Sequence, residues 1–332
     1  MNLVFIIDPL ESLKVEKDSS IAMIQEAIMR GHRVLVMHQG DLSYENNIVM
    51  ARVKELRLKQ PEEIHTRWYD EGSEERIPLT QFDVVLMRKD PPFDMEYIYS
   101  TYLLEIAQQQ GVLVINNPKS VRDHNEKLAI TKFPDFIPAT IVTRNEQLIR
   151  EFLNQHRDIV LKPLDGMGGA SIFRVHSTDP NLSVILEMMT HYGTRTIMAQ
   201  RFLPEIVLGD KRILLIAGKP VPYALARKPK AGEIRGNLAA GGIGVIQPLT
   251  ERDAQIANTI GPILNNVGLV LVGLDVIGDS LTEINVTSPT GMREITKHTG
   301  FNVAGMMIDA LEELVGRLNS DMYESNFAIA VY

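Results

Sequence analysis

Residues 273–291 read GLDVIGDSLTEINVTSPTG, and this stretch carries more structural information than any other in the chain. Two apolar runs, residues 269–277 and 281–286, flank Gly278, Asp279 and Ser280. Glycine with short polar residues between two apolar runs is typical of a tight turn. The sequence therefore predicts a β-hairpin whose loop holds these three residues.

One face of this hairpin is expected to carry several oxygen ligands. Glu283 and Asn285 are two residues apart on a strand, so their side chains leave the same face. A loop of three residues places Asp275 directly opposite Glu283. Like charges in that position are destabilising unless a cation lies between them, and carboxylate and amide oxygens suit magnesium. A hairpin with a merely solvated polar face has the same pattern, so both interpretations stay open on these residues alone.

Length and composition limit the classes of protein to which this chain can belong. A chain of 332 residues is expected to form two or three compact units, and 45% hydrophobic residues is usual for a globular protein. No apolar run is long enough to span a bilayer, and the first one breaks at Asp8 and Pro9, as expected of a strand rather than a signal peptide. The absence of cysteine excludes disulfides and thiolate sites and predicts a cytoplasmic protein. The net charge of −8 argues against nucleic acid, so we expect neither a nucleic-acid nor a membrane partner.

The first third of the chain alternates between strand and helix patterns. An apolar strand at residues 3–7, a helix at 21–30 and a second strand at 33–37 form a β-α-β unit, which implies parallel strands. Ser19 or Ser20 is the expected N-cap of that helix, and further strands are expected at residues 83–87 and 112–116. Residues 45–75 show no clean periodicity and stay undecided between a meander and a loop.

Ligands of a parallel sheet bind beyond the carboxyl ends of its strands. The residues at these ends are Asp8, Arg88, Lys89, Asp90 and Asn116. Loop residues with local hydrogen bonds would occupy the same places, and that interpretation is favoured without further support.

The middle of the chain contains a candidate phosphate site. Thr143 is a possible cap of an amphipathic helix, which is followed by the strand DIVLKPL (residues 158–164) with Lys162 in its apolar run. The loop GMGG at residues 166–169 follows, and a loop with so little side-chain bulk lets backbone N–H groups approach phosphate oxygens. A hairpin turn beside a solvent-reaching lysine is the competing interpretation.

A second glycine-rich piece, residues 231–244, holds Glu233, Arg235 and Asn237. Its composition fits a lid that keeps water from a reactive intermediate, and equally a surface loop. Arg212 and Arg227 lie on or beside the neighbouring strands and suit carboxylate or phosphate. The chain has no Walker A, HExxH or GxSxG motif, which removes the common hydrolase and zinc interpretations.

Taken together, these segments resemble the ATP-grasp superfamily and, more closely, the prokaryotic glutathione synthetases. The segments that carry the resemblance are MRKDPPFD, RDHNEKL, LKPLDGMGGASIFRV, MAQRFLPE, GDKRIL, RGNLAAGG, GLDVIGD and LTEINVTSPTG. The resemblance implies an α/β fold, in which an N-terminal parallel βαβ substrate domain (1–122) precedes an ATP-grasp fold of two α+β lobes. The lobes are expected at residues 123–202, with the phosphate loop, and 203–318, with the metal site and lid, before a tail at 319–332.

The resemblance also implies roles for individual residues. ATP would be bound by Lys127, Lys162, Gly166, Gly168, Gly169, Gln200, Leu203 and Asp210. The metal ligands would be Asp275, Glu283 and Asn285, and the catalytic residues Arg212, Arg227 and Asn237. The substrate would be held by Arg88, Lys89, Ser288, Pro289 and Thr290.

The activity implied by the resemblance is ATP-dependent ligation of γ-glutamylcysteine to glycine through an acyl phosphate, with Mg²⁺, or Mn²⁺ as an alternative, in a homotetramer. The alternatives are a ligase of the D-alanine–D-alanine or glutamate-adding type, a silent ATP-binding regulatory module, and a structural protein. Those ligases tend to carry Pro-Gly after the metal asparagine, whereas Val286 and Thr287 follow Asn285 here.

Overall fold

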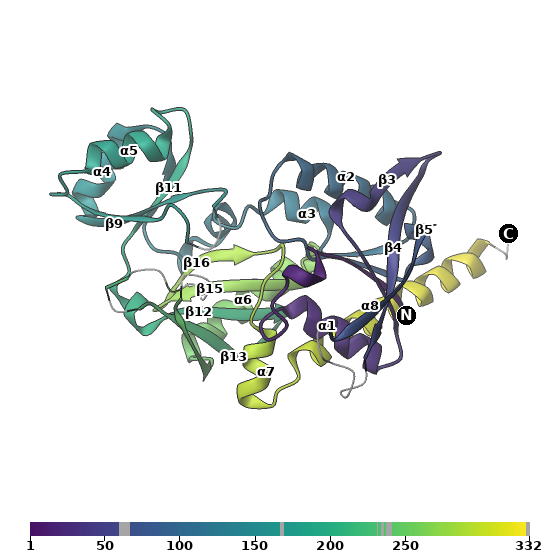
Figure 1. Cartoon of the computed structure of the whole chain (residues 1–332). Coiled ribbons are helices and arrows are strands. Elements are labelled where there is room, and N and C mark those ends of the chain that lie inside the picture. Colours follow the sequence, from purple (N-terminus) through teal and green to yellow (C-terminus); the bar gives the residue numbers. More distant parts are fainter. Residues whose placement is uncertain (60–66, 167–168, 231, 234–235, 237–240, 330–332) are drawn as a thin grey trace.

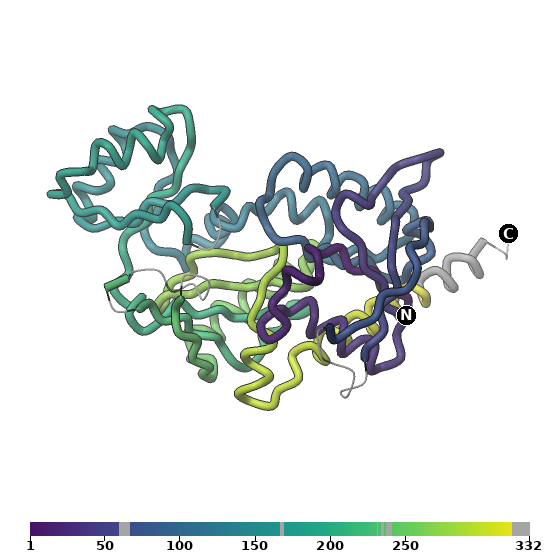
Figure 2. Tube along the Cα trace, viewed as in Figure 1, coloured from purple at the N-terminus to yellow at the C-terminus, as the bar shows by residue number. Residues whose placement is uncertain are grey.

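The computed structural model describes residues 1–59, 67–166, 169–230, 232–233, 236 and 241–329. Within these residues the strands form three sheets (Figure 1). The second sheet and its helices, residues 140–201, form a lobe that projects from the rest of the molecule (Figure 2). We call residues 140–201 the middle lobe.

The first sheet has the expected parallel centre. In it β1 pairs in parallel with β2 and β6, and β6 pairs in parallel with β7. The undecided segment adds antiparallel strands at the β2 edge. The strands of this sheet are β1 (Asn2–Ile6), β2 (Arg33–Met37), β3 (Leu42–Glu45), β4 (Ile48–Leu58), β5 (Tyr69–Pro78), β6 (Val84–Met87) and β7 (Leu113–Ile115).

Helices cover both faces of the first sheet because the side chains of β1 alternate between two cores. Leu3 and Phe5 pack in one core with residues of α1 (Ser19–Met29), whereas Val4 and Ile6 pack in the other with residues of α2 (Met95–Gln109). The short helix α3 (Pro118–Asp123) follows β7.

The N-cap of α1 differs from the expectation. Asp18 is the cap, and its carboxylate accepts a hydrogen bond of 2.9 Å from the Ile21 amide. The two serines are occupied elsewhere, since Ser20 Oγ accepts from Arg88 and Ser19 Oγ accepts from the Met292 amide. The expected serine cap was therefore wrong, because tertiary partners outside the helix take both hydroxyl groups.

The middle lobe has a core of its own. Its antiparallel sheet, in the order β10-β9-β11-β8, packs through residues such as Ile159, Leu161 and Ile197 against two helices. The elements are β8 (Thr140–Thr143), α4 (Glu146–His156), β9 (Asp158–Pro163), β10 (Phe173–His176), α5 (Leu182–Thr190) and β11 (Ile197–Arg201).

The cap of α4 is Asn145, not the expected Thr143. Asn145 Oδ1 accepts hydrogen bonds from the Gln147 and Leu148 amides, at 2.9 and 3.4 Å. Thr143 Oγ1 accepts from the Asn145 amide at 3.0 Å, so it orders the turn before the cap.

The third sheet is antiparallel throughout, in the order β14-β13-β12-β15-β16. Helix α6 packs against β12 and β13. The elements are β12 (Asp210–Ile216), β13 (Lys219–Lys228), β14 (Ile243–Pro248), α6 (Glu251–Asn266), β15 (Leu271–Ile277) and β16 (Ser280–Asn285).

The predicted hairpin is β15–β16. Asp275 and Glu283 pair as predicted, although the loop between the strands is shorter than predicted. Ile277 pairs with Ser280, so Gly278 and Asp279 alone form the loop. The register then shifts between Val276 and Asp275, which leaves Thr282 as an extra residue, a β-bulge. Asp275 consequently faces Glu283, as predicted.

The C-terminal helices return to the N-terminal sheet. Helix α7 (Met292–Thr299) and helix α8 (Val303–Ile329) both pack against α1, and Arg30 donates to Asp309 at 2.5 Å. The expected tail begins inside α8, which continues as far as Ile329. None of the helices in the described residues combines the length and apolar character needed to cross a membrane.

Candidate active site

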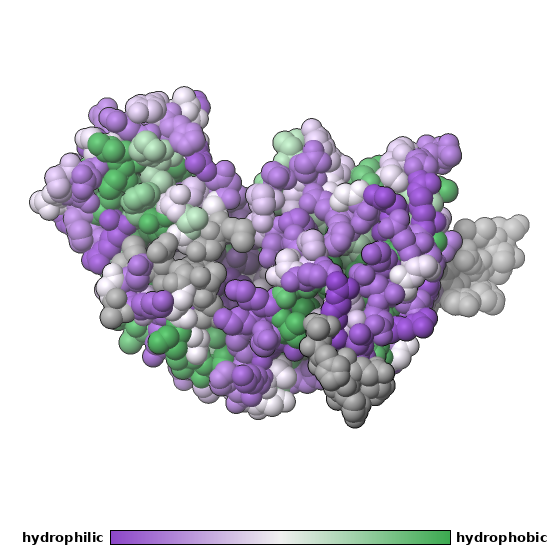
Figure 3. Space-filling view, viewed as in Figure 1, coloured by the Kyte–Doolittle hydropathy of each residue, from purple (hydrophilic) through white to green (hydrophobic). Residues whose placement is uncertain are grey.

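A cavity lies between the middle lobe and the third sheet, and we call it the main cavity. It encloses about 880 Å³ when counted out to its open mouth. Figure 3 shows a notch in the surface between the lobe and the rest of the molecule. The structure brings together here nine of the residues selected from the sequence: Lys127, Lys162, Gly166, Gly169, Gln200, Leu203, Asp210, Asp275 and Glu283.

Strand alternation explains why the middle lobe contributes polar groups to this cavity. On β9, Ile159 and Leu161 belong to the core of the lobe, whereas Val160 and Lys162 line the cavity. Because successive side chains of a strand point to opposite faces, Lys162 reaches the cavity although its strand reads as almost wholly apolar.

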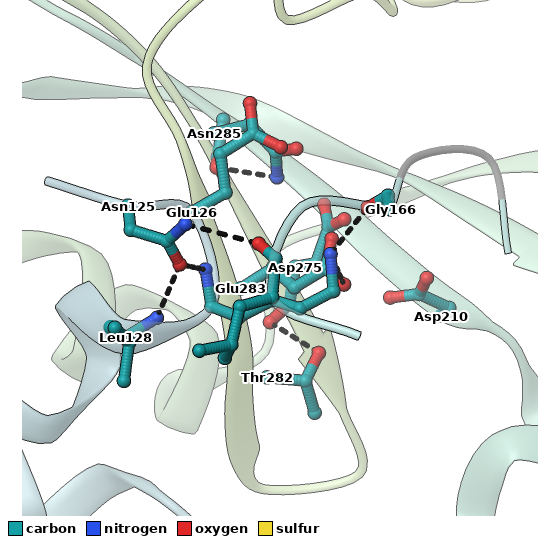
Figure 4. Close-up of polar contacts among 12 residues, drawn as sticks. Asn125, Glu126, Leu128, Gly166, Asp210, Asp275, Thr282, Glu283 and Asn285 are labelled. Carbon is teal, nitrogen blue, oxygen red and sulfur yellow. Dashed lines mark hydrogen bonds and ion pairs between the residues drawn. The ribbon is translucent and has the colours of Figure 1, made fainter. Parts of the chain in front are cut away.

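The third sheet supplies a row of charged groups from neighbouring strands. Arg212 on β12 pairs with Asp275 on β15, which pairs with Glu283 on β16. Arg212 holds Asp275 with two hydrogen bonds, Nε to Oδ1 at 2.5 Å and Nη2 to Oδ2 at 3.0 Å. Arg227 adds a contact of 2.8 Å to Asp275 Oδ2 and a hydrogen bond of 2.5 Å to Asp210. Figure 4 shows the three carboxylate residues of this region, Asp210, Asp275 and Glu283.

The same surroundings move two carboxylate pKa values in opposite directions. Burial alone would raise the pKa of Asp275, but the charges of Arg212 and Arg227 outweigh it and hold the pKa below its ordinary value. Burial raises the pKa of Asp210 to about 6, although Arg227 opposes the shift. One buried oxygen of Asp210, Oδ1, has no hydrogen-bond partner among the described residues. Asp210, which lines the cavity, thus has a buried acceptor without a partner among the described residues.

Two lysines approach the cavity from different parts of the chain. Lys127 Nζ donates to the Gly166 carbonyl at 2.6 Å and lies 3.6 Å from Glu283 Oε1. Burial lowers the pKa of Lys162, and the charge of Glu283 offsets this only in part. A Cβ on Gly166 would lie 2.8 Å from Pro163 Cγ, so the close approach of this loop requires glycine. The arrangement can neutralise an anion such as a polyphosphate.

The oxygen ligands of the hairpin fit a hard cation in part. Glu283 is partly exposed in the cavity, and Asn285 uses its amide nitrogen on the Gly273 carbonyl at 3.2 Å, which leaves its amide oxygen free for a cation. Asp275, in contrast, already has arginine partners at both oxygens. The described residues hold no group of three or more His, Cys, Asp or Glu side chains able to bind a metal. A cation here would therefore need further oxygen atoms from a ligand.

Two of the selected residues, Gly168 and Asn237, lie outside the described residues, as does half of the expected lid (231, 234–235 and 237–240). Gly236, within that segment, is described and lines the cavity. A Cβ on Gly236 would lie 2.3 Å from the Arg227 carbonyl oxygen and 3.3 Å from Asp210 Cβ. The backbone at Gly236 thus packs directly on the Asp210–Arg227 pair.

The residues selected for substrate binding are not among the residues that line the main cavity, and a hydrogen bond joins two of them, Arg88 and Pro289. The buried Arg88 donates to Ser20 Oγ at 3.1 Å, to the Thr287 carbonyl at 3.4 Å and to the Pro289 carbonyl at 3.0 Å. Ser288 Oγ donates to Asp90. The contacts of Lys89 Nζ are Asp8 at 2.8 Å and the Asp90 carbonyl at 3.0 Å, and Thr290 is exposed. The segment 287–290, which follows β16, is therefore held in place by the residues that follow β6.

Asn116, at the end of β7, joins two sheets. Its side-chain nitrogen donates to the Leu271 and Val286 carbonyls, both at 2.8 Å, and its oxygen accepts from the Leu271 amide at 2.9 Å. Asn116 lies at the carboxyl end of a strand, where ligands were expected, but its side chain makes a structural contact between sheets.

Sequence reasoning missed the apolar end of the main cavity. This end is lined by Val160, Ile172, Phe202, Leu203, Ile206 and Ile277, of which only Leu203 was selected. The available signal was alternation, since Val160 and Ile277 are two residues from Lys162 and Asp275 on their strands. A cavity lined by both apolar and charged side chains suits a ligand with a flat ring and phosphates.

A second, smaller cavity of about 460 Å³ shares Gly166 with the first. Glu126 lines it and accepts from Thr287 Oγ1 at 3.0 Å. Burial, followed by the charge of Glu283, raises the pKa of Glu126. No sequence pattern had singled out Glu126, although it is the neighbour of Lys127.

Comparison with protein families agrees with this geometry. Residues 1–122 match the family model of the prokaryotic glutathione synthetase N-terminal domain, and residues 126–300 match that of its ATP-grasp domain. The glutathione synthetase of Nitrosomonas europaea is 64% identical over 319 residues, which are 96% of this chain and all of that protein. That of Escherichia coli O6:H1 is 53% identical over 312 residues, 94% of this chain and 98% of that protein.

Solved structures share the fold at much lower sequence identity. The crystal structure of the D-cycloserine synthetase DcsG is 14% identical, with a TM-score of 0.65, over 96% of this chain and all of the other. The ATP-grasp ligase PsnB, complexed with minimal precursor, Mg and ADP, is 15% identical, with a TM-score of 0.60, over 95% of this chain and 98% of the other. These likenesses confirm the expected α/β fold with an ATP-grasp part. With the matched family models and the identity of the relatives, they lead to one conclusion: the chain belongs to the family of prokaryotic glutathione synthetases.

Proposed function

We propose that the chain is an ATP-dependent ligase that joins γ-glutamylcysteine to glycine and releases glutathione, ADP and phosphate. The observation that carries the proposal is the convergence of two lysines and two carboxylates, Lys127, Lys162, Asp275 and Glu283, on one cavity with an apolar end. Such a cavity suits a nucleoside triphosphate, and the curated relatives are glutathione synthetases.

The reaction needs activation of a carboxylate, which is a poor electrophile. The cysteine carboxylate of the dipeptide attacks the γ-phosphorus of ATP. The bond from this phosphorus to the β,γ-bridging oxygen breaks, so that ADP leaves and an acyl phosphate is formed. The glycine amine then forms the C–N bond, and phosphate leaves with the bonding electrons of the C–O bond. Positioning and charge neutralisation are the main requirements of phosphoryl transfer.

The residues of the main cavity match these requirements. Lys127 and Lys162 would hold the phosphates, with the loop at Gly166, Gly168 and Gly169. Asp275, Glu283 and Asn285 would hold Mg²⁺, or Mn²⁺ in its place, which neutralises phosphate charge when bound. Further ligands for this cation would come from the phosphate oxygens of ATP.

The remaining selected residues would act around this centre. Gln200, Leu203 and Asp210 would contact the nucleoside, and Arg212, Arg227 and Asn237 the phosphates and substrate carboxylates. The dipeptide would lie against Arg88, Lys89, Ser288, Pro289 and Thr290. The lid at residues 231–244 would keep water from the acyl phosphate.

We also propose the wider organisation that the family resemblance implies. The units would be residues 1–122, 123–202 and 203–318 with a tail to 332, assembled as a cytoplasmic homotetramer. The cysteine-free composition is compatible with a reducing compartment. The mass in solution, measured by light scattering, would test the tetramer.

The decisive experiment incubates the purified protein with Mg-ATP, γ-glutamylcysteine and glycine, and follows phosphate release and product mass. Glutathione formed in step with phosphate is the expected result. The variants Lys162→Ala and Glu283→Ala should lose turnover while keeping the fold, whereas Lys219→Ala, at an exposed position of β13, should behave like the wild type. Near-normal turnover in both site variants would remove the mechanism.

The same assay separates the alternatives. Phosphate release only with D-alanine or with glutamate as the added amino acid would identify another ATP-grasp ligase. Neither product nor phosphate from a folded protein that binds ATP would favour a silent regulatory module.

A further inference from the structure

Phe202 belongs to the apolar part of the main-cavity lining, and its amide bonds to the carbonyl of Asp158, four positions before Lys162 on β9. It follows β11 directly, and its neighbours in the lining include Ile172, Leu203 and Ile206. Under the proposed function, the flat base of ATP would occupy this apolar part, because the phosphates need the charged side chains.

One face of the Phe202 ring is already covered by a cation. The guanidinium carbon of Arg174, on β10, lies 3.6 Å from the ring centroid. Phe202 can therefore meet the cavity only with its other face or its edge. A cation this close to a ring is attracted by the negative face of the π system.

Asp158, at the start of β9, holds both members of this stack. Its carboxylate accepts from Arg174 Nε at 3.0 and 3.2 Å and from Nη2 at 2.7 Å. Its backbone carbonyl accepts from the Phe202 amide at 3.0 Å. The guanidinium plane and the ring are consequently fixed relative to each other by a single residue.

We propose that Asp158, Arg174 and Phe202 form a stack that sets the base-binding wall of the main cavity, with Arg174 and Asp158 as positioning residues. Because Phe202 loses its rotational freedom before the ligand arrives, less conformational entropy is lost on binding. The inference rests on the proposed use of ATP and deepens it.

The test compares two ligands of the intact protein by calorimetry, ATP and inorganic triphosphate, which lacks the base. Arg174→Ala should weaken ATP binding about three- to tenfold, the range of a cation–π contact, and leave triphosphate binding unchanged. In turnover assays the KM for ATP should rise with kcat nearly constant. Arg150→Ala, on α4 of the same lobe and hydrogen-bonded to Ser183, is the matched control and should change neither affinity.

A double-mutant cycle with Phe202→Ala checks the coupling. The effect of Arg174→Ala on ATP binding should disappear in the Phe202→Ala background. Arg174→Lys, which keeps the charge but not the planar group, should give an intermediate affinity and serves if the alanine variant folds poorly.

Three results would overturn the inference. ATP binding by Arg174→Ala and Arg174→Lys equal to that of the wild type would show that the stack does not set the wall. An equal loss of ATP and triphosphate affinity would mean that Arg174 supports the lobe as a whole. Failure of the wild type itself to bind ATP would remove the proposed function and the inference together, and is distinguishable because no variant is involved.

Discussion

Asp275 and Glu283 lie opposite each other across the β15–β16 hairpin but have different surroundings. Asp275 is buried between Arg212 and Arg227, whereas Glu283 is partly exposed and faces Lys127 at 3.6 Å. The two candidate metal ligands should therefore respond differently to removal of their charge.

Asp275→Asn should lose both activity and stability. The substitution leaves two buried guanidinium groups short of a partner, which costs about 3 kcal/mol or more in the free energy of unfolding. Glu283→Gln should lose activity but less than about 1 kcal/mol of stability, because its ion pair is partly solvated. Urea denaturation of both variants checks this, and equal destabilisation would contradict the assigned surroundings.

Lys162→Met should lower turnover without lowering the stability of the folded protein. The buried ammonium is costly, as its lowered pKa indicates, so its removal should leave the free energy of unfolding unchanged or raise it. Turnover should fall about 100-fold or more, as when a charge-stabilising donor is lost. Thermal unfolding and phosphate release are the two measurements.

Lys211→Met is the contrasting control for that prediction. Lys211 is also buried, but it pairs with Asp253 and donates to the Gly278 carbonyl at 2.9 Å. Its loss leaves a fully buried carboxylate without its partner and should destabilise the protein by about 3–5 kcal/mol. A similar stability change in both lysine variants would refute the distinction.

Asp210 should make stability depend on pH in a specific direction. Its pKa is about 6 in the folded protein against an ordinary 3.8, so between these values the folded state holds a proton that the unfolded chain has released. The resulting stability is fully present below about pH 4 and is lost as the pH rises through 6. Asp210→Asn cannot titrate, so it should gain stability relative to the wild type over that interval.

Urea denaturation at pH 4, 5, 6 and 7 measures the difference between Asp210→Asn and the wild type. Asp279→Asn, in the exposed hairpin turn, is the control. A difference that stays constant with pH would show that Asp210 does not titrate in this interval.

Asn116→Ala should be destabilising although the residue is far from the charged row. Three hydrogen bonds to the backbone of Leu271 and Val286 are lost, and buried groups stay unpaired. We expect a loss of about 2–4 kcal/mol. Asn117→Ala, which removes the cap of α3 and a hydrogen bond of 3.4 Å to Gln108, should cost about 1 kcal/mol. An equal effect of the two substitutions would argue against the bridge between the sheets.

Much of this protein could be predicted from local patterns. The parallel strands at residues 2–6 and 33–37, the helix ending before Gly31 and the hairpin at 271–285 follow from periodicity and turn residues, which act over a few positions. The pairing of Asp275 with Glu283 was also predicted correctly, although the loop has two residues and the bulge at Thr282 restores the register. A bulge depends on packing across the sheet, which a single strand pattern does not contain.

Short motifs and strand alternation are enough to predict the fold class, the family and nine of the residues that line the main cavity. The partners of those residues depend on the tertiary structure. Ser19 and Ser20 lost the cap to Asp18 because Met292 and Arg88 take their hydroxyl groups, and Asp275 lies between two arginines from other strands. Arg174 packs over the ring of Phe202 although 28 positions separate the two residues in the chain. Contacts between distant segments are set by how strands pair and helices pack, and local sequence does not encode that geometry.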